Sequence, residues 1–130
     1  MDMILNTIRM NDYDQNNQFI SADIESLEEN LAIGFINPLD FKEMYLVPSL
    51  KLRLSNNYGE VVINFKQDEN VSRGLIIMPV SIWSNQLTYT ENNNIVYKNI
   101  KVKVEGTRDP PTKFIELVNK IKNYNSKSAK

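Results

Sequence analysis

The sequence predicts a mainly β fold in the form of a small closed or half-closed barrel. Its apolar segments are short, polar turns separate them, and little chain is left for the helical crossovers that a parallel α/β sheet needs. The longest buried run, Leu75 to Met78, stands between Gly74 and Pro79. A run this short between two such residues is typical of a strand buried on both faces. We expect the other strands to be arranged around it.

Composition narrows the functions that the chain can perform. The 130 residues carry a formal net charge of −1, so no basic field favours nucleic acid or a membrane surface as a partner. Histidine and cysteine are absent, which removes the commonest general base, the commonest metal ligand and any disulfide. No segment has the layout of a membrane span or a signal peptide. We therefore expect one cytoplasmic domain in which independent catalysis is hard to build.

The first predicted strand ends in a polar set of side chains. The apolar residues Met3 to Leu5 predict the strand, and Asn6, Thr7 and Arg9 follow it. The planar fork of an arginine suits phosphate, and a threonine hydroxyl with backbone amides can complete a cradle for an oxyanion. The alternative is a strand-end arginine in water. The polar segment 11–18 then predicts an exposed loop.

Two short helices and a second strand are expected next. Ser21 to Glu28 has a capping serine and helical spacing of its apolar residues, and Leu31 to Ile36 reads as a second buried strand. Asn37 or Asp40 can then begin a helix that extends from Pro38 to Met44. We expect its apolar side chains to face the core: Leu39, Phe41 and Met44.

A hairpin and a last strand complete the predicted barrel. Leu50 to Phe65 alternates apolar and polar residues on both sides of a turn, in which Asn57 or Gly59 is expected to adopt a positive φ. Gln86 to Thr90 favours a β conformation, and Ile100 to Val104 alternates cleanly.

The C-terminal part predicts a helix. Asp109 to Thr112 has the residues of a helix start, and an apolar stripe follows at i, i+3, i+4 and i+7: Phe114, Leu117, Val118 and Ile121. We expect a barrel over 1–109, a helix over 110–124 that packs on it, and a mobile tail over 125–130.

The loop after the buried strand contains the only tryptophan. Pro79 ends the strand, and Trp83, Ser84 and Asn85 follow in a polar context. Ligands are often bound where a strand passes into a loop at one end of a sheet. The alternative is a core strand followed by a loop that a buried tryptophan anchors.

Three stretches in this order carry a resemblance to a known family: Leu5 to Arg9 with Gln15 beyond it, Tyr58 to Val62, and Gly74 to Pro79 with Trp83 to Asn85. From about Ile4 to about Val104, the chain resembles the small dinucleotide-binding subunit of the tungsten- and molybdenum-dependent formylmethanofuran dehydrogenases. It is more distantly similar to the C-terminal molybdopterin-dinucleotide-binding domain of formate dehydrogenases.

The resemblance implies a double-psi β-barrel that binds the guanine-dinucleotide part of a bis-pyranopterin cofactor. It also implies a non-catalytic subunit of a molybdenum or tungsten oxidoreductase, in which a catalytic partner subunit holds the metal. A chain without histidine or cysteine suits this supporting role. By the same resemblance, the residues expected to contact the cofactor are Asn6, Thr7, Arg9, Gln15, Pro79, Trp83, Ser84 and Asn85.

Ile8 separates this expectation from an alternative. It stands where the family has glycine, and a β-branched side chain can block the approach of a phosphate to the backbone. The alternative is a stand-alone double-psi barrel that has lost the cofactor and binds another protein. A hydrolase or decarboxylase on the same barrel has less support, because its acids read as surface charges: Asp12, Asp14 and Glu60.

Overall fold

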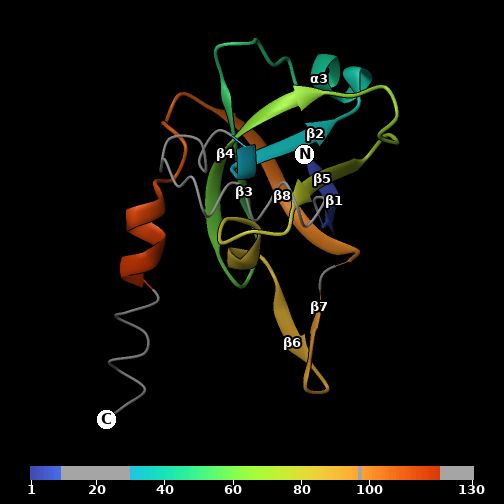
Figure 1. The fold of residues 1–130 in the computed structure, drawn as a ribbon. Helices are drawn as coiled ribbons and strands as arrows, with labels where there is room; N and C mark the ends of the chain where they lie inside the picture. The colour runs from blue at the N-terminus through green and yellow to red at the C-terminus, as the bar shows by residue number, and fades with distance from the viewer. Residues whose placement is uncertain (10–29, 97, 121–130) are drawn as a thin grey trace.

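Six strands close into a barrel in the computed structural model, which describes residues 1–9, 30–96 and 98–120 (Figure 1). Their order around the barrel is β1-β5-β2-β4-β3-β8, which confirms the predicted fold class and is consistent with a double-psi barrel. The barrel strands are β1 (Asp2–Ile8), β2 (Ile33–Ile36), β3 (Lys51–Ser55), β4 (Glu60–Gln67), β5 (Leu75–Pro79) and β8 (Ile100–Thr107).

Parallel and antiparallel pairs alternate irregularly around this barrel. β1 pairs with β5 in parallel, and so does β2 with β4, whereas the remaining neighbours are antiparallel. A parallel pair brings the carboxyl ends of two strands to the same end of a barrel. The barrel therefore has one end at which β1 and β5 both finish.

Side chains of alternating strand residues fill the barrel. In β5, Ile76 and Met78 are fully buried, while Leu75 and Ile77 are half-buried. The prediction that this strand is buried equally on both faces is wrong, because the wall of a barrel has only one inner face. The largest fully buried side chains are Leu5, Ile36, Leu52, Leu54, Val61, Ile63, Ile76, Met78, Trp83, Leu87, Ile100 and Leu117.

The helix α3 (Pro38–Glu43) begins where the sequence predicts. Asn37 caps it, since the Asn37 side chain accepts a hydrogen bond of 2.8 Å from the Leu39 amide, and Pro38 stands in the first turn. Leu39 is 54% exposed, so the prediction that it faces the core is wrong. Phe41 and Met44 do pack against the core.

The buried side chain on α3 is Asp40, which ties the helix to the start of β5. Its carboxylate is fully buried and accepts hydrogen bonds from Arg73 Nε at 2.6 Å and from the Gly74 amide at 2.8 Å. Gly74 has a φ of 81°, a conformation that glycine adopts at little cost. The Gly74 carbonyl in turn accepts a hydrogen bond from Ile4 in β1. Asp40 thereby fixes the turn from which the central strand begins.

The predicted hairpin between β3 and β4 is present, but its turn is made differently. Neither Asn57 nor Gly59 has a positive φ, so that prediction is wrong. The side chain of Asn56 closes the turn instead, because its Oδ1 accepts hydrogen bonds from the amides of Tyr58 at 2.8 Å and Gly59 at 3.1 Å.

A second, smaller hairpin projects from the barrel (Figure 1). After the short 3-10 helix η1 (Ser84–Gln86), β6 (Tyr89–Glu91) pairs with β7 (Asn94–Val96). Asn92 and Asn93 form its turn with φ values of 53° and 66°, as a two-residue hairpin of this kind requires.

The C-terminal segment is helical over 114–120, and Leu117 from this stretch is fully buried in the core. The rest of the predicted helix and the predicted tail lie outside the described residues, as do the predicted loop 11–18 and the predicted helix Ser21 to Glu28. Within the described ranges, no helix is both long and apolar enough to cross a membrane.

Candidate functional site

The polar end of β1 and the loop after β5 meet at one rim of the barrel. Thr7 is opposite Met78 and Ile8 is opposite Pro79 in the parallel pairing. The contact continues beyond the strands, because the Val80 amide donates a 2.8 Å hydrogen bond to the Ile8 carbonyl. Two segments that lie far apart in the sequence are thus neighbours.

A cavity of about 290 Å³ opens at this rim, and its described lining residues are Thr7, Arg9, Val80 and Lys98. The Lys98 ammonium donates a hydrogen bond to the Thr7 carbonyl, and Arg9 is exposed. An ammonium and a guanidinium beside the same cavity supply charge-assisted donors for an anion.

Lys98 is a site residue that sequence reasoning missed. It precedes β8, and it reaches the rim because β8 pairs with β1. The neighbouring Asn99 has a φ of 56°, and its amide donates a 2.7 Å hydrogen bond to Asn6 Oδ1. The asparagine that was predicted to contact a ligand therefore also positions the segment that carries the lysine. No signal in the sequence identifies a strand partner, so Lys98 could not be found from its surroundings in the chain.

The other predicted site residues are distributed between the rim and the core. Pro79 is buried at the end of β5, and Asn85 is exposed. Ser84 is fully buried, and its hydroxyl accepts a 2.9 Å hydrogen bond from the Ser81 amide and donates one of 3.1 Å to the Ser81 carbonyl. These bonds shape the loop after β5. Gln15 lies outside the described residues.

Trp83 is placed inside the core. Its side chain is 1% exposed, its indole N–H donates a 2.7 Å hydrogen bond to the Thr112 carbonyl, and its ring lies 6.2 Å from that of Phe114. The tryptophan therefore anchors the rim loop to the C-terminal segment, and the exposed surface of the rim near it belongs to its neighbours.

The side chain of Ile8 leaves the cavity open. It is 42% exposed and is not among the residues that line the cavity. Because successive strand residues point to opposite faces, Thr7 points inward and is 2% exposed while Ile8 points out. The β-branched side chain at this position does not fill the space between Arg9 and Lys98.

The β3–β4 turn, residues 56–59, lies at the same end of the barrel. β8 runs antiparallel to both β1 and β3, so the start of β8 lies beside the ends of both strands. The turn also contacts the loop after β5, because Asn56 Nδ2 donates a 2.9 Å hydrogen bond to the Leu87 carbonyl. The rim thus consists of the end of β1, the loop after β5, the start of β8 and this turn.

Replacing Gly59 with alanine is expected to lower the free energy of unfolding by about 1–3 kcal/mol. A Cβ atom at this position would lie 2.2 Å from the Gln86 carbonyl oxygen, and a backbone atom cannot rotate away as a side chain can. Urea denaturation followed by circular dichroism measures the loss. The exposed neighbour provides the control, since Asn57→Ala is expected to change stability by less than about 0.5 kcal/mol. Equal effects of the two substitutions would contradict the close packing of the turn on η1.

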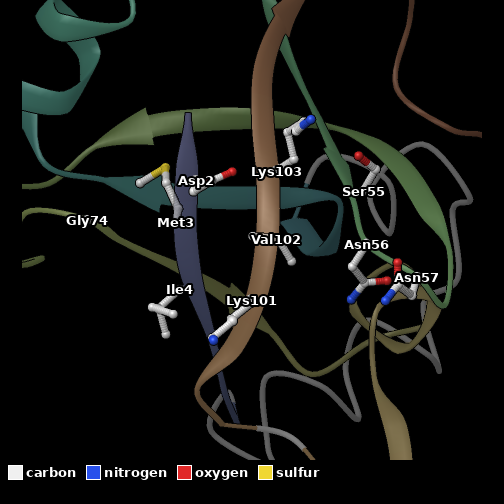
Figure 2. Close-up of a pocket in the computed structure, with 10 residues that line it drawn as sticks. All are labelled: Asp2, Met3, Ile4, Ser55, Asn56, Asn57, Gly74, Lys101, Val102 and Lys103. Atoms are coloured by element: carbon white, nitrogen blue, oxygen red, sulfur yellow. The ribbon is translucent and has the colours of Figure 1, made fainter.

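A larger cavity, of about 570 Å³, lies along β1, β8 and the β3–β4 turn (Figure 2). Lys101 and Lys103 from β8 line it together with Asn56 and Asn57 from the turn. Lys101 and Lys103 are exposed, so the positive charge that begins at Lys98 continues along β8, away from the rim.

Comparisons with known proteins agree with this architecture. The family model described as "Molydopterin dinucleotide binding domain" matches residues 3–114. Among 97 matching chains of solved structures, acetylene hydratase from Pelobacter acetylenicus has a TM-score of 0.56 at 12% sequence identity; the match covers 79% of this chain and 18% of that one. At this identity the likeness shows the fold alone, and the present chain spans less than a fifth of that enzyme. No curated protein matches the chain.

Proposed function

Because the chain belongs to the molydopterin dinucleotide binding domain family, we propose that its rim holds the dinucleotide phosphates of a molybdopterin-type cofactor. The observation that carries the proposal is the cavity between Arg9 and Lys98 at the end of β1. A pyrophosphate is an anion with many acceptor oxygens, and a guanidinium and an ammonium are the side chains that bind such groups best. The donor set therefore fits the group.

Each residue of the rim has a separate task in this proposal. Arg9 and Lys98 neutralise the phosphate charge, and Asn6 holds Asn99, so that the backbone before β8 keeps Lys98 in place. Asn85, which is exposed on the loop after β5, offers an amide to the ligand. Trp83 and Ser84 act on the ligand through the shape of this loop.

We further propose that the cofactor is the guanine dinucleotide form of a bis-pyranopterin, bound jointly with a catalytic oxidoreductase subunit of the formylmethanofuran dehydrogenase type. The cofactor supplies the molybdenum or tungsten centre at which the redox chemistry takes place, while this chain supplies binding and orientation. Three sequence motifs and a chain without histidine or cysteine support this role. The barrel over 1–109, the helix over 110–124 and the tail over 125–130 are its proposed parts.

A second candidate is a protein-interaction module that has lost the cofactor. Exposed apolar side chains near the end of α3 favour it: Leu39 at 54%, Tyr45 at 90% and Val47 at 49%. Large exposed apolar side chains of this kind are typical of contact sites between proteins. The open cavity beside Ile8 supports the first candidate over the second, because the space for a phosphate is retained.

Binding of inorganic pyrophosphate to the isolated chain tests the proposal. Arg9→Gln and Lys98→Gln are each expected to weaken binding by roughly tenfold, because each removes one charge-assisted hydrogen bond worth about 1.5 kcal/mol. Titration calorimetry at low salt measures the affinity, which is expected to fall as salt is raised.

Lys42→Gln is the matched control. Lys42 is an exposed lysine on α3, beyond the opposite end of β2 from the rim, so its loss is expected to leave the affinity unchanged. An equal loss in all three variants would indicate binding through overall charge and would refute the rim site. A complete lack of pyrophosphate binding would favour the second candidate.

A further inference from the structure

Two tyrosine rings are stacked at the rim end of the barrel. The centroids of Tyr58, in the β3–β4 turn, and Tyr89, at the start of β6, are 4.6 Å apart, with 12° between the ring planes. Tyr58 is nevertheless 60% exposed. Because Tyr89 covers one face of the Tyr58 ring, an exposure this large requires the opposite face to be open to solvent.

The Tyr58 ring is held in place before any ligand binds. Asn56 fixes the turn through the amides of Tyr58 and Gly59 on one side and through the Leu87 carbonyl on the other. Gly59 itself packs directly on the Gln86 carbonyl. A ring supported in this way loses little conformational freedom when a second ring stacks on it, so little of the stacking energy is lost.

The stacked pair lies within reach of the phosphate site. Around the barrel, β8 separates β1 from β3, and two strand spacings amount to about 10 Å. Tyr89 is also opposite Val96 in the small hairpin, and Lys98 follows Val96 by two positions in the sequence. A nucleotide whose phosphates lie at Arg9 and Lys98 can therefore extend its base across the start of β8 toward Tyr58.

We infer that the open face of Tyr58 is a stacking platform for a nucleobase of the dinucleotide. The inference rests on the proposed function and adds the site at which the base is recognised. Stacking on an aromatic side chain depends on the π-face that every base has, so it tolerates different bases. The platform therefore binds a guanine or an adenine base with similar affinity, and it provides base affinity without selecting guanine.

Three probes separate the platform from the phosphate site: inorganic pyrophosphate, GDP and guanosine, each titrated into the full chain. Tyr58→Leu is expected to weaken GDP binding by roughly tenfold, the size of a stacking contribution, and to leave pyrophosphate binding unchanged. Tyr58→Phe keeps the ring and is expected to retain the affinity for GDP. Arg9→Gln is expected to weaken both GDP and pyrophosphate.

Tyr45→Leu provides the matched control. Tyr45 is 90% exposed and follows α3, away from the rim, so its replacement is expected to leave GDP binding unchanged. ADP is expected to behave as GDP does.

The outcomes distinguish the two proposals. If GDP binding is insensitive to Tyr58→Leu while Arg9→Gln weakens it, the platform is refuted and the phosphate site stands. If pyrophosphate does not bind at all, the phosphate site is refuted, and guanosine alone then decides the platform. In that case, guanosine must shift NMR resonances of the rim in the wild type and not in Tyr58→Leu; equal responses in both would refute the platform.

Discussion

Replacing Trp83 with alanine is expected to lower the free energy of unfolding by about 3–5 kcal/mol, the range for removing a large buried aromatic side chain. The tryptophan is 1% exposed, and its indole N–H donates to the Thr112 carbonyl at 2.7 Å. The substitution leaves a cavity in the core and removes the hydrogen bond that connects the rim loop to the C-terminal segment. Urea denaturation followed by circular dichroism measures the effect.

Trp83→Phe keeps this prediction testable even where Trp83→Ala does not fold. Phenylalanine fills most of the space and lacks only the indole N–H, so we expect a smaller loss, about 1–3 kcal/mol. A loss below about 1 kcal/mol for the alanine variant would show that the side chain is not an anchor of the core.

Replacing Asp40 with alanine is expected to lower the free energy of unfolding by about 2–4 kcal/mol. The carboxylate is fully buried and accepts hydrogen bonds from Arg73 and from the Gly74 amide, and hydrogen bonds to a charged group contribute about 1.5–3 kcal/mol. The Arg73 side chain is 49% exposed, so water can solvate its charge once Asp40 is removed, which limits the loss. Urea denaturation measures it.

Glu43→Gln is the control for Asp40→Ala, because Glu43 pairs with the same arginine from an exposed position. A solvent-exposed ion pair contributes about 0–1 kcal/mol, so the loss is expected to be clearly smaller. Similar losses for the two variants would show that the ion pairs, and not the buried bond to the Gly74 amide, hold the start of β5.

The sequence predicted the barrel strands because each one records its environment in its residue order. Leu52 and Leu54 alternate with exposed neighbours in β3, and the apolar run of β5 lies between a turn residue and a proline. The cap at Asn37 was equally readable, since side-chain capping is a local interaction. These features depend on neighbours in the chain, and periodicity describes them directly.

Features that depend on contacts between distant segments were not predictable. Gly59 is required because Gln86 lies against it, and not because the turn needs a positive φ. Asp40 reads as a helix-start acid in the sequence, but it is buried because Gly74 and Arg73 are its partners. Because of these bonds α3 turns Asp40 inward, and Leu39 is exposed.

The candidate site was predictable only in part for the same reason. The polar end of β1 could be recognised as suited to an anion, and the parallel pairing with β5 brings the predicted loop beside it. Lys98 joins Arg9 only through the pairing of β8 with β1. The functional or structural use of Trp83 could not be decided from its position in the chain, because both readings place a tryptophan after the same strand.

The closed order of strands also determines how copies of this protein can associate. In a ring, every strand already has a neighbour on each side, so the barrel presents no open edge to which a strand of another molecule can add. Within the described part of the chain, β6 and β7 are the strands that keep an unpaired edge, and each is only three residues long. Edges this short are poor templates for aggregation, and we expect concentrated solutions of the folded protein to resist assembly by strand addition.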